Sequence, residues 1–288
     1  MHTAPQQPEG GQSALWNGPA GRAWVALQEV LDRMFEPFAQ VLLEAAAREP
    51  VRQVLDVGCG AGGTTLALAD SLGSRGGCLG IDVSEPLVAL ARARVRDAGT
   101  PVRFICADAQ THAFAPERFD LVVSRFGVMF FGDPVGAFSN LRRAARDGAA
   151  LRFVAWRSPL ENPFMTAAER AVAQLLPPSA APAPNAPGQF AFADGARVHA
   201  ILVQSGWIDV EIRRLDRDCT FAERDLLPYL TQMGPLGRAL PGLEASTRAR
   251  VIEAARAAVE PYVHGPDVRF TAVCWQVDAR ASSVRKLT

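Results

Sequence analysis

Hydrophobic residues near the start of the chain recur every three or four positions. Between residues 19 and 48 an apolar stripe begins at Trp24 and Leu27 and continues through Leu31 to Leu42. This spacing is typical of an amphipathic helix that buries one face. Pro37 interrupts the stripe, because proline cannot donate the backbone hydrogen bond that a helix interior needs. The segment therefore predicts two helices or one kinked helix.

Short apolar runs follow between residues 51 and 156, and segments with helical spacing separate them. The runs read VRQVLDV, GGCLGIDV, VRFICA, FDLVVS and ALRFVAW, and helical spacing is found over 63–72, 86–98 and 134–146. Strands that alternate with helices at this spacing predict a parallel sheet with helices on both of its faces.

The rhythm changes after Arg157. The pattern predicts helices over 162–176, 194–205, 223–233 and 244–262, and strands over 208–221 and 268–277. Because a long helical excursion joins the last two strands, we expect them to run antiparallel. The predicted fold class is α/β, with a Rossmann-like, doubly wound, seven-stranded and mostly parallel sheet, an antiparallel last strand, N-terminal helices and a helical substrate insertion.

The same pattern divides the chain into functional segments. We predict a disordered N-terminus (1–13), an N-terminal helical cap (14–50), a cofactor-binding core (51–157), a lid or linker (158–193) that contains the low-complexity run PPSAAPAPNAPG, a core helix and strand (194–222), a helical substrate-binding insertion (223–266), and a last core strand with a tail (267–288).

Composition narrows the class of partner. Basic and acidic residues number 30 each, so the formal net charge is zero, and this balance favours neither nucleic acid nor a membrane surface as partner. No apolar run approaches the ~18 residues that span a bilayer. The five cysteines include no C-x-x-C pair, so we expect a cytoplasmic protein without a metal site. A small molecule is the expected partner, and a monomer and a homodimer are both left open.

Three of the apolar runs end in an aspartate, at Asp56, Asp82 and Asp108. In open α/β sheets, ligands bind outside the carboxyl ends of the strands. Aspartate is also a common first residue of a helix, which explains any single one of the three. Three carboxylates at successive strand ends instead predict one shared site.

The loop after the first run has the glycine spacing of a dinucleotide-binding fingerprint. Gly58, Gly60 and Gly63 satisfy G-x-G-x-x-G, which fits NAD as a ligand. However, Asp56 places a carboxylate at the mouth of this loop, where it repels a pyrophosphate and attracts the ammonium and sulfonium of S-adenosylmethionine (SAM). An NAD-dependent oxidoreductase would also need a catalytic Tyr-x-x-x-Lys or a similar pair, and Lys286 is the only lysine.

The segments DVGCGAGG, GIDVS, ADA and FDLVVSRF resemble the successive motifs of class I SAM-dependent methyltransferases, in particular the UbiE-like group that acts on small molecules. The resemblance is strong from residue 51 to about residue 156, and it makes SAM the expected cofactor. It implies that Asp56, Gly58 and Gly60 hold the methionine part of SAM, that Asp82 holds the ribose, and that Asp108 with Ala109 holds the adenine. The remaining cofactor contacts implied for the core are Cys59, Thr64, Val83, Ser124 and Phe126.

The segment WNGPAGRAW resembles stretches that precede the core in this group, where leading helices cover the cofactor. The resemblance implies that Trp16 and Arg22 close on the carboxylate end of SAM. The alternative is that Trp16 and Trp24 only pack an added helix, since buried aromatic residues usually serve cores.

The acceptor side lacks a diagnostic base. We expect the acceptor to be a hydrophobic or aromatic metabolite, methylated on oxygen or carbon, because apolar segments are placed to cover the site. Arg125 can bind an anionic acceptor or pair with Glu161. The weak catalytic candidates are Arg125, Tyr262 and His264. The predicted acceptor contacts are Arg125, Phe130, Trp156, Phe164, Met165, Tyr229 and Met233.

One further class of function stays open at this point. A non-catalytic SAM-binding or scaffold protein would keep the cofactor pocket and use the helical insertion to hold a partner. Neither the glycine loop nor the three aspartates distinguish this protein class from an enzyme.

Overall fold

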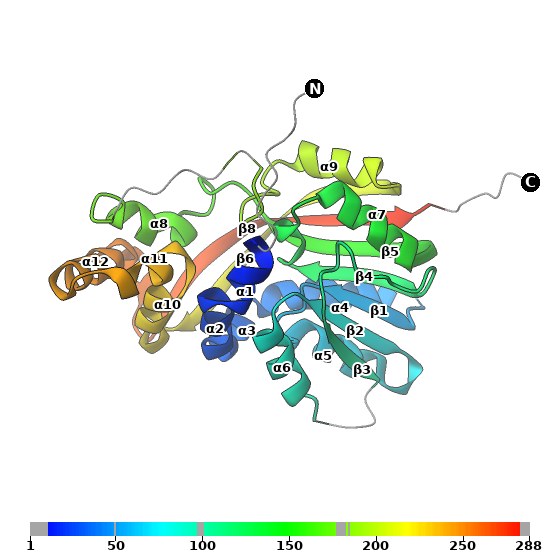
Figure 1. The fold of residues 1–288 in the computed structure, drawn as a ribbon, viewed down its shortest axis with the longest axis horizontal. Helices are drawn as coiled ribbons and strands as arrows, with labels where there is room; N and C mark the ends of the chain where they lie inside the picture. The colour runs from blue at the N-terminus through cyan, green and yellow to red at the C-terminus, as the bar shows by residue number, and fades with distance from the viewer. Residues whose placement is uncertain (1–10, 49, 97–100, 177–182, 184, 283–288) are drawn as a thin grey trace, which may run out of the picture.

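The computed structural model describes residues 11–48, 50–96, 101–176, 183 and 185–282 (Figure 1). Helix α1 (Gly11–Asn17) begins inside the segment that we predicted to be disordered, so that prediction is wrong for residues 11–13. Residues 1–10, most of the low-complexity run and the end of the tail lie outside the described residues.

One sheet organises the fold, in the order β3-β2-β1-β4-β5-β8-β6, with β7 paired to β8. Strands β1 to β5 are parallel, and β8 runs antiparallel to both β5 and β6, which confirms the predicted fold class. The two-residue β7 adds an eighth strand to the seven predicted. The strands are β1 (Gln53–Val57), β2 (Gly77–Asp82), β3 (Val102–Cys106), β4 (Phe119–Arg125), β5 (Ala145–Trp156), β6 (Trp207–Ala222), β7 (Val263–His264) and β8 (Asp267–Ala281).

Strand order and handedness place the helices of the core. From β1 the chain moves through α5 (Gly63–Leu72) and α6 (Glu85–Ala93) toward one edge of the sheet, and from β4 it moves through α7 (Pro134–Ala144) toward the other. Because parallel crossovers are right-handed, α7 lies on the face opposite α5 and α6. Helix α4 (Glu36–Arg48) contacts α5, and α9 (Gly195–Gln204) contacts α7. The direction reverses between β1 and β4, so a crevice opens at their carboxyl ends.

Residues 19–48 form three helices, α2 (Pro19–Ala26), α3 (Gln28–Met34) and α4, where we predicted two helices or one kinked helix, and α1 precedes them. Helices α1, α2 and α3 are followed directly by α4, and Pro37 lies in the first turn of α4 rather than in a helix interior. Proline is tolerated in a first turn because the backbone N–H groups there have no partner inside the helix.

Side chains of α1 hold the N-terminal helices on the loop after β2. The Asn17 amide donates to the Val83 carbonyl and accepts from the Glu85 N–H, both at 2.9 Å. The Ser84 hydroxyl donates to the Trp16 carbonyl at 2.7 Å. These contacts form a clasp, made by residues 16–21 over residues 83–85, which brings α2 beside α6 (Figure 1).

A helical subdomain packs at the C-terminal end of β6 and the N-terminal end of β8 (Figure 1). Its members are α8 (Pro163–Val172), α10 (Leu226–Gln232), α11 (Gly234–Ala239) and α12 (Ala245–Ala258). Val172, Leu236 and Val251 belong to a small core of its own. Helix α8 packs on α12, so part of the predicted lid joins the predicted insertion. Single-turn helices are found at 73–75, 128–130, 223–225, 240–242 and 260–262.

The clasp generates a test. A methyl group added at Gly21 would lie 1.9 Å from the Trp16 carbonyl oxygen and 2.9 Å from the Ser84 hydroxyl. We expect Gly21→Ala to destabilise the docked helices by roughly 1–3 kcal/mol, as overpacking does, and to speed amide hydrogen exchange over residues 11–26. Gly242→Ala is the control, because the space beside Gly242 is open. Equal exchange in both variants would contradict the proposed clasp.

Candidate functional site

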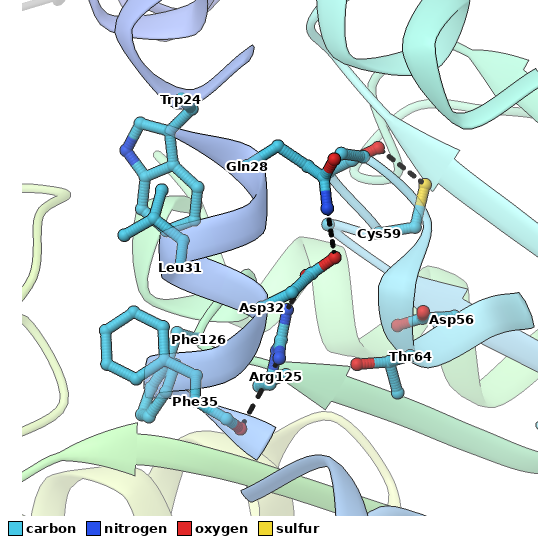
Figure 2. Close-up of a pocket in the computed structure, with 13 residues that line it drawn as sticks. Trp24, Gln28, Leu31, Asp32, Phe35, Asp56, Cys59, Thr64, Arg125 and Phe126 are labelled. Carbon is cyan, nitrogen blue, oxygen red and sulfur yellow. Dashed lines mark hydrogen bonds and ion pairs between the residues drawn. The ribbon is translucent and has the colours of Figure 1, made fainter. Parts of the chain in front are cut away.

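A pocket that is partly open to solvent lies at the crevice between β1 and β4 (Figure 2). Helix α3 forms one wall, and the glycine loop after β1 with the start of α5 forms the other. The lining residues are Trp24, Gln28, Leu31, Asp32, Phe35, Asp56, Gly58, Cys59, Gly60, Ala61, Thr64, Arg125 and Phe126.

Two glycines shape the glycine loop in different ways. Gly58 has φ +69°, and a methyl group there would lie 2.6 Å from the Cα of Gly127, in the loop after β4. Gly60 has φ +53°, and a methyl group there would meet no atom within 4 Å. Both conformations favour glycine. Gly58 therefore permits close packing of the two loops, whereas Gly60 leaves an open surface that a side chain would fill.

Asp56 is a buried carboxyl group on the pocket wall, 1% exposed. The Thr65 hydroxyl donates to its Oδ2 at 2.6 Å. Burial raises the pKa of Asp56 to about 6, although the Thr65 hydrogen bond and the Arg125 charge both lower it. At neutral pH the pocket therefore holds a mostly ionised carboxylate in surroundings that disfavour its charge.

The first turn of α5 presents polar groups that have no side-chain partner in the described residues. The Thr64 hydroxyl is buried without a hydrogen-bond partner, and no side chain caps the helix at Gly62. Figure 2 shows the Thr64 oxygen directed into the space between the glycine loop and α3. Buried polar groups normally have partners, so a free hydroxyl facing a pocket points to a ligand.

Helix α3 adds polar pocket residues that sequence reasoning missed. Asp32 Oδ2 accepts from Arg94 at 2.7 Å and from Gln28 at 2.5 Å, and Asp32 Oδ1 faces Arg125 at 3.4 Å. Arg94 also donates to the Ala61 carbonyl at 2.6 Å, which ties α3 to the glycine loop. The signal in the sequence was a polar pair, Gln28 and Asp32, four positions apart beside an apolar stripe.

The loop after β4 carries strain at the pocket. Phe126 has φ +64°, an uncommon conformation for a bulky residue, and its ring stacks on Trp156 at 4.9 Å. Ser124 supports this turn: its hydroxyl donates to the Val57 carbonyl and accepts from the N–H groups of Gly127 and Val128. The hydroxyl of Ser124 is fully used by backbone groups and does not line the pocket.

The structure brings only part of the predicted cofactor set to the pocket. Asp82 ends β2 and does not line the pocket. Its carboxylate accepts from the N–H groups of Gly60 at 2.8 Å and Ser84 at 2.9 Å. Burial raises the pKa of Asp82. Asp108 accepts from the side chain and backbone of Gln110. The predicted cofactor residues that line the pocket are Asp56, Gly58, Cys59, Gly60, Thr64 and Phe126.

Other predicted cofactor residues lie around the pocket or away from it. Trp16 belongs to the clasp, where its ring meets Trp24 at 5.8 Å and Phe130 at 5.1 Å. Val83 accepts from Asn17 in the same clasp, and Ala109 is buried in the core. Arg22 is exposed on α2 and does not line the pocket, so its contact with SAM stays a prediction.

Most predicted acceptor residues do not line the pocket. Phe164, Tyr229 and Tyr262 form an aromatic cluster with Phe221 and Phe270 at the base of the helical subdomain. Their rings pack against one another as part of the main hydrophobic core, which reaches the base of the subdomain, and none of them lines the pocket. The other predicted acceptor residues outside the pocket lining are Phe130, Trp156, Met165 and Met233.

The three catalytic candidates differ in whether they line the pocket. His264 is exposed in the β7–β8 hairpin and pairs with Asp267 there. Arg125 lines the pocket and faces Asp32, whereas Glu161 pairs with Arg157, so the predicted Arg125–Glu161 pair does not form. Of the three candidates, only Arg125 reaches the pocket.

Residues 54–148 match the family model described as a methyltransferase domain. Aklanonic acid methyltransferase DauC of Streptomyces sp. (strain C5) is 30% identical over 120 residues, which are 41% of this chain and 54% of the relative. Ubiquinone/menaquinone biosynthesis C-methyltransferase UbiE of Shewanella frigidimarina is 27% identical over 119 residues, 41% of this chain and 47% of the relative. The chain thus spans about half the length of these curated relatives.

Solved structures share the fold. The YcgJ protein of Bacillus subtilis aligns with a TM-score of 0.55 and 16% identity, over 86% of this chain and 99% of that one.

Within the described residues, no helix has the length and apolar character needed to cross a membrane. The same part of the chain contains no group of three or more His, Cys, Asp or Glu side chains that could hold a metal ion.

The burial of Asp56 generates a test of stability against pH. The folded protein keeps a proton on Asp56 in the window between its ordinary pKa of 3.8 and about 6, where the unfolded chain has released it. Stability from this group is therefore present at low pH and is lost as pH rises through about 6. At neutral pH we expect the free energy of unfolding of Asp56→Asn to exceed that of the parent by up to about 3 kcal/mol.

Urea titrations at several pH values measure this difference. The advantage of Asp56→Asn should shrink as the pH falls below the ordinary pKa of 3.8, where Asp56 is protonated in the folded and unfolded states alike. Asp70→Asn, an exposed carboxyl group on α5, is the matched control and should show no comparable gain. An Asp56→Asn advantage that does not change with pH would contradict the raised pKa.

Proposed function

Because residues 54–148 match the model of a methyltransferase domain, we propose that this chain transfers the methyl group of SAM to an oxygen or carbon atom of a hydrophobic or aromatic small molecule. The observation that carries the proposal is the buried Asp56 carboxylate beside the open surface of Gly60. The family match also decides between the two cofactors that fit the glycine spacing, in favour of SAM.

The pocket residues fit the methionine end of SAM. The Asp56 carboxylate suits an ammonium group, since an opposite charge stabilises the ionised form of a buried carboxyl group. The unpartnered Thr64 hydroxyl and the uncapped first turn of α5 suit a carboxylate, because helix N-termini favour negative charge. When bound, SAM supplies an electrophilic methyl group on a sulfonium.

The adenosine end is assigned to the loops after β2 and β3. We assign the ribose to Asp82, which lies next to the glycine loop through its hydrogen bond with the Gly60 N–H, and the adenine to Asp108 with Ala109. The clasp lies on the same loop as Val83, so Trp16 and α2 are placed to cover this end. Cys59 and Phe126 line the pocket between the two ends.

Aromatic and aliphatic side chains on α2 and α3 support a hydrophobic acceptor. Trp24, Leu31, Phe35 and Phe126 line the pocket, and Figure 2 shows them on the side of α3 away from Cys59, whereas Gln28 and Asp32 point toward the glycine loop. Such walls exclude water and hold a ring system, and this alignment is the main contribution that an enzyme can make to methyl transfer. The names of the two relatives, an aklanonic acid methyltransferase and a ubiquinone/menaquinone C-methyltransferase, agree with this class of acceptor.

The zero net charge supports a small molecule, rather than nucleic acid or a membrane, as the partner. A cytoplasmic location and a monomeric or homodimeric state belong to the same proposal.

Calorimetry and a transfer assay test the function together. We expect SAM and its demethylated product to bind while NADH does not, and labelled methyl to be transferred to a member of a panel of phenols, quinones and polyketide-like acids. Absence of SAM binding would refute the proposal. SAM binding without transfer to any member would instead support the scaffold protein.

The free hydroxyl of Thr64 provides a sharper test of the cofactor site. Thr64→Val keeps the shape and removes a buried group without a partner, so the free protein should become more stable by roughly 1 kcal/mol while SAM affinity falls by a similar amount. Thr231→Val is the matched control, because the Thr231 hydroxyl bonds the Leu227 carbonyl in α10. Unchanged SAM affinity in Thr64→Val would refute this contact.

A further inference from the structure

Arg125 is the only cation among the described residues that line the pocket. It is the last residue of β4 and lines the pocket beside Phe35 and Phe126 (Figure 2). Its side chain is 14% exposed, so the guanidinium has given up most of its water. A largely buried cation is stable only where anions or carbonyl groups compensate for the lost hydration.

Two long hydrogen bonds hold the Arg125 guanidinium, and its charge also interacts with the buried Asp56 carboxylate. Its donors reach Asp32 Oδ1 and the Phe35 carbonyl, both at 3.4 Å, near the limit of a hydrogen bond. The other oxygen of Asp32 is bound more closely, by Arg94 at 2.7 Å and by Gln28 at 2.5 Å. Arg125 can therefore turn to an anionic ligand while Asp32 keeps two strong partners.

The groups that could remove a proton from an acceptor are poorly placed. Tyr262 packs on Phe164, and His264 is exposed in a hairpin, so neither lines the pocket. Burial and the Asp82 charge raise the pKa of the Cys59 thiol well above its ordinary value, which keeps the thiol protonated. Asp56 accepts from Thr65 at the methionine end. An acceptor that has already lost its proton needs none of these groups.

We propose that the acceptor is a hydrophobic aryl carboxylic acid, that Arg125 binds its carboxylate, and that the product is the methyl ester. This inference rests on the proposed function and narrows it to oxygen. A carboxylate oxygen forms the new bond to the methyl carbon as the carbon–sulfur bond breaks, and the electron pair of that bond returns to sulfur. The anion and the sulfonium are both consumed, and no proton is released.

The walls and the cation divide the recognition between them. Trp24, Leu31 and Phe35 contact the ring system of the acceptor. Arg125 recognises its carboxylate through a charge-assisted hydrogen bond. The amide or phenol of the same ring system lacks the anion, so it leaves Arg125 with only its two long contacts. The pocket should therefore discriminate within a matched set of ligands that share one ring system.

The experiment uses aryl carboxylic acids of increasing ring number, each beside its primary amide and the corresponding phenol. Binding to the full chain is measured by calorimetry with the demethylated cofactor present, and ester formation is followed by mass spectrometry. We expect acids to bind and to be esterified, and Arg125→Gln to weaken acid binding about 10- to 100-fold. Arg125→Lys should restore part of the affinity, since it restores the charge without the planar fork.

Arg33→Gln is the matched control, because Arg33 is exposed on α3 next to Asp32 and does not line the pocket. It should leave acid binding and SAM binding unchanged. SAM affinity and circular dichroism verify that Arg125→Gln is folded. If Arg125→Gln does not fold, Arg125→Lys with the acid, amide and phenol series decides.

The outcomes separate the two proposals. Loss of SAM binding in the parent protein refutes the proposed function itself. Normal SAM binding with methylation of phenols but of no acid overturns the carboxylate proposal. Acid binding of equal strength in the parent and in Arg125→Gln overturns it as well.

Discussion

The close approach of two backbone loops is the constraint on which the site depends. Gly58 and Gly127 pack so tightly that a methyl group on Gly58 would lie 2.6 Å from the Gly127 Cα, and one on Gly127 would lie 2.5 Å from the Val57 carbonyl oxygen. The Ser124 hydroxyl bonds across the same contact. This contact joins the ends of β1 and β4 at the point where the strand order reverses, and it thereby sets the distance between Asp56 and the Arg125–Phe126 pair.

The pocket concentrates features that oppose stability. Asp56 is ionised while buried, Thr64 has no partner for its hydroxyl, and Phe126 adopts a left-handed conformation. Each of these costs free energy in the folded protein, and strain of this kind gathers at functional sites because the surrounding structure compensates for it. The large apolar core that the sheet shares with its helices offsets this free-energy cost, as do the ion pairs of Asp32 with Arg94 and Arg125.

Local patterns predicted the core of the fold well. Apolar runs bounded by glycine and aspartate identified β1 to β5, because buried parallel strands need continuous apolar side chains. Asp56 and the glycine loop identified the pocket for the same reason, since strand ends and loop chemistry are local properties. Most of the predicted acceptor residues lie outside the pocket lining and stay a prediction. Phe164 and Tyr229 pack with the main hydrophobic core, and an apolar sequence segment does not say which neighbour an aromatic ring meets.

By itself the sequence determined the alternation of strands and helices, the ligand class of the glycine loop and the absence of an overall charge that would attract nucleic acid. Each of these depends on residues close together in the chain or on simple sums. Only the tertiary structure decided that Asp32 meets both Arg94 and Arg125, that Ser124 serves the backbone, and that His264 is remote from the pocket lining. These contacts join elements separated by dozens of residues, and packing, rather than periodicity, selects which of them form.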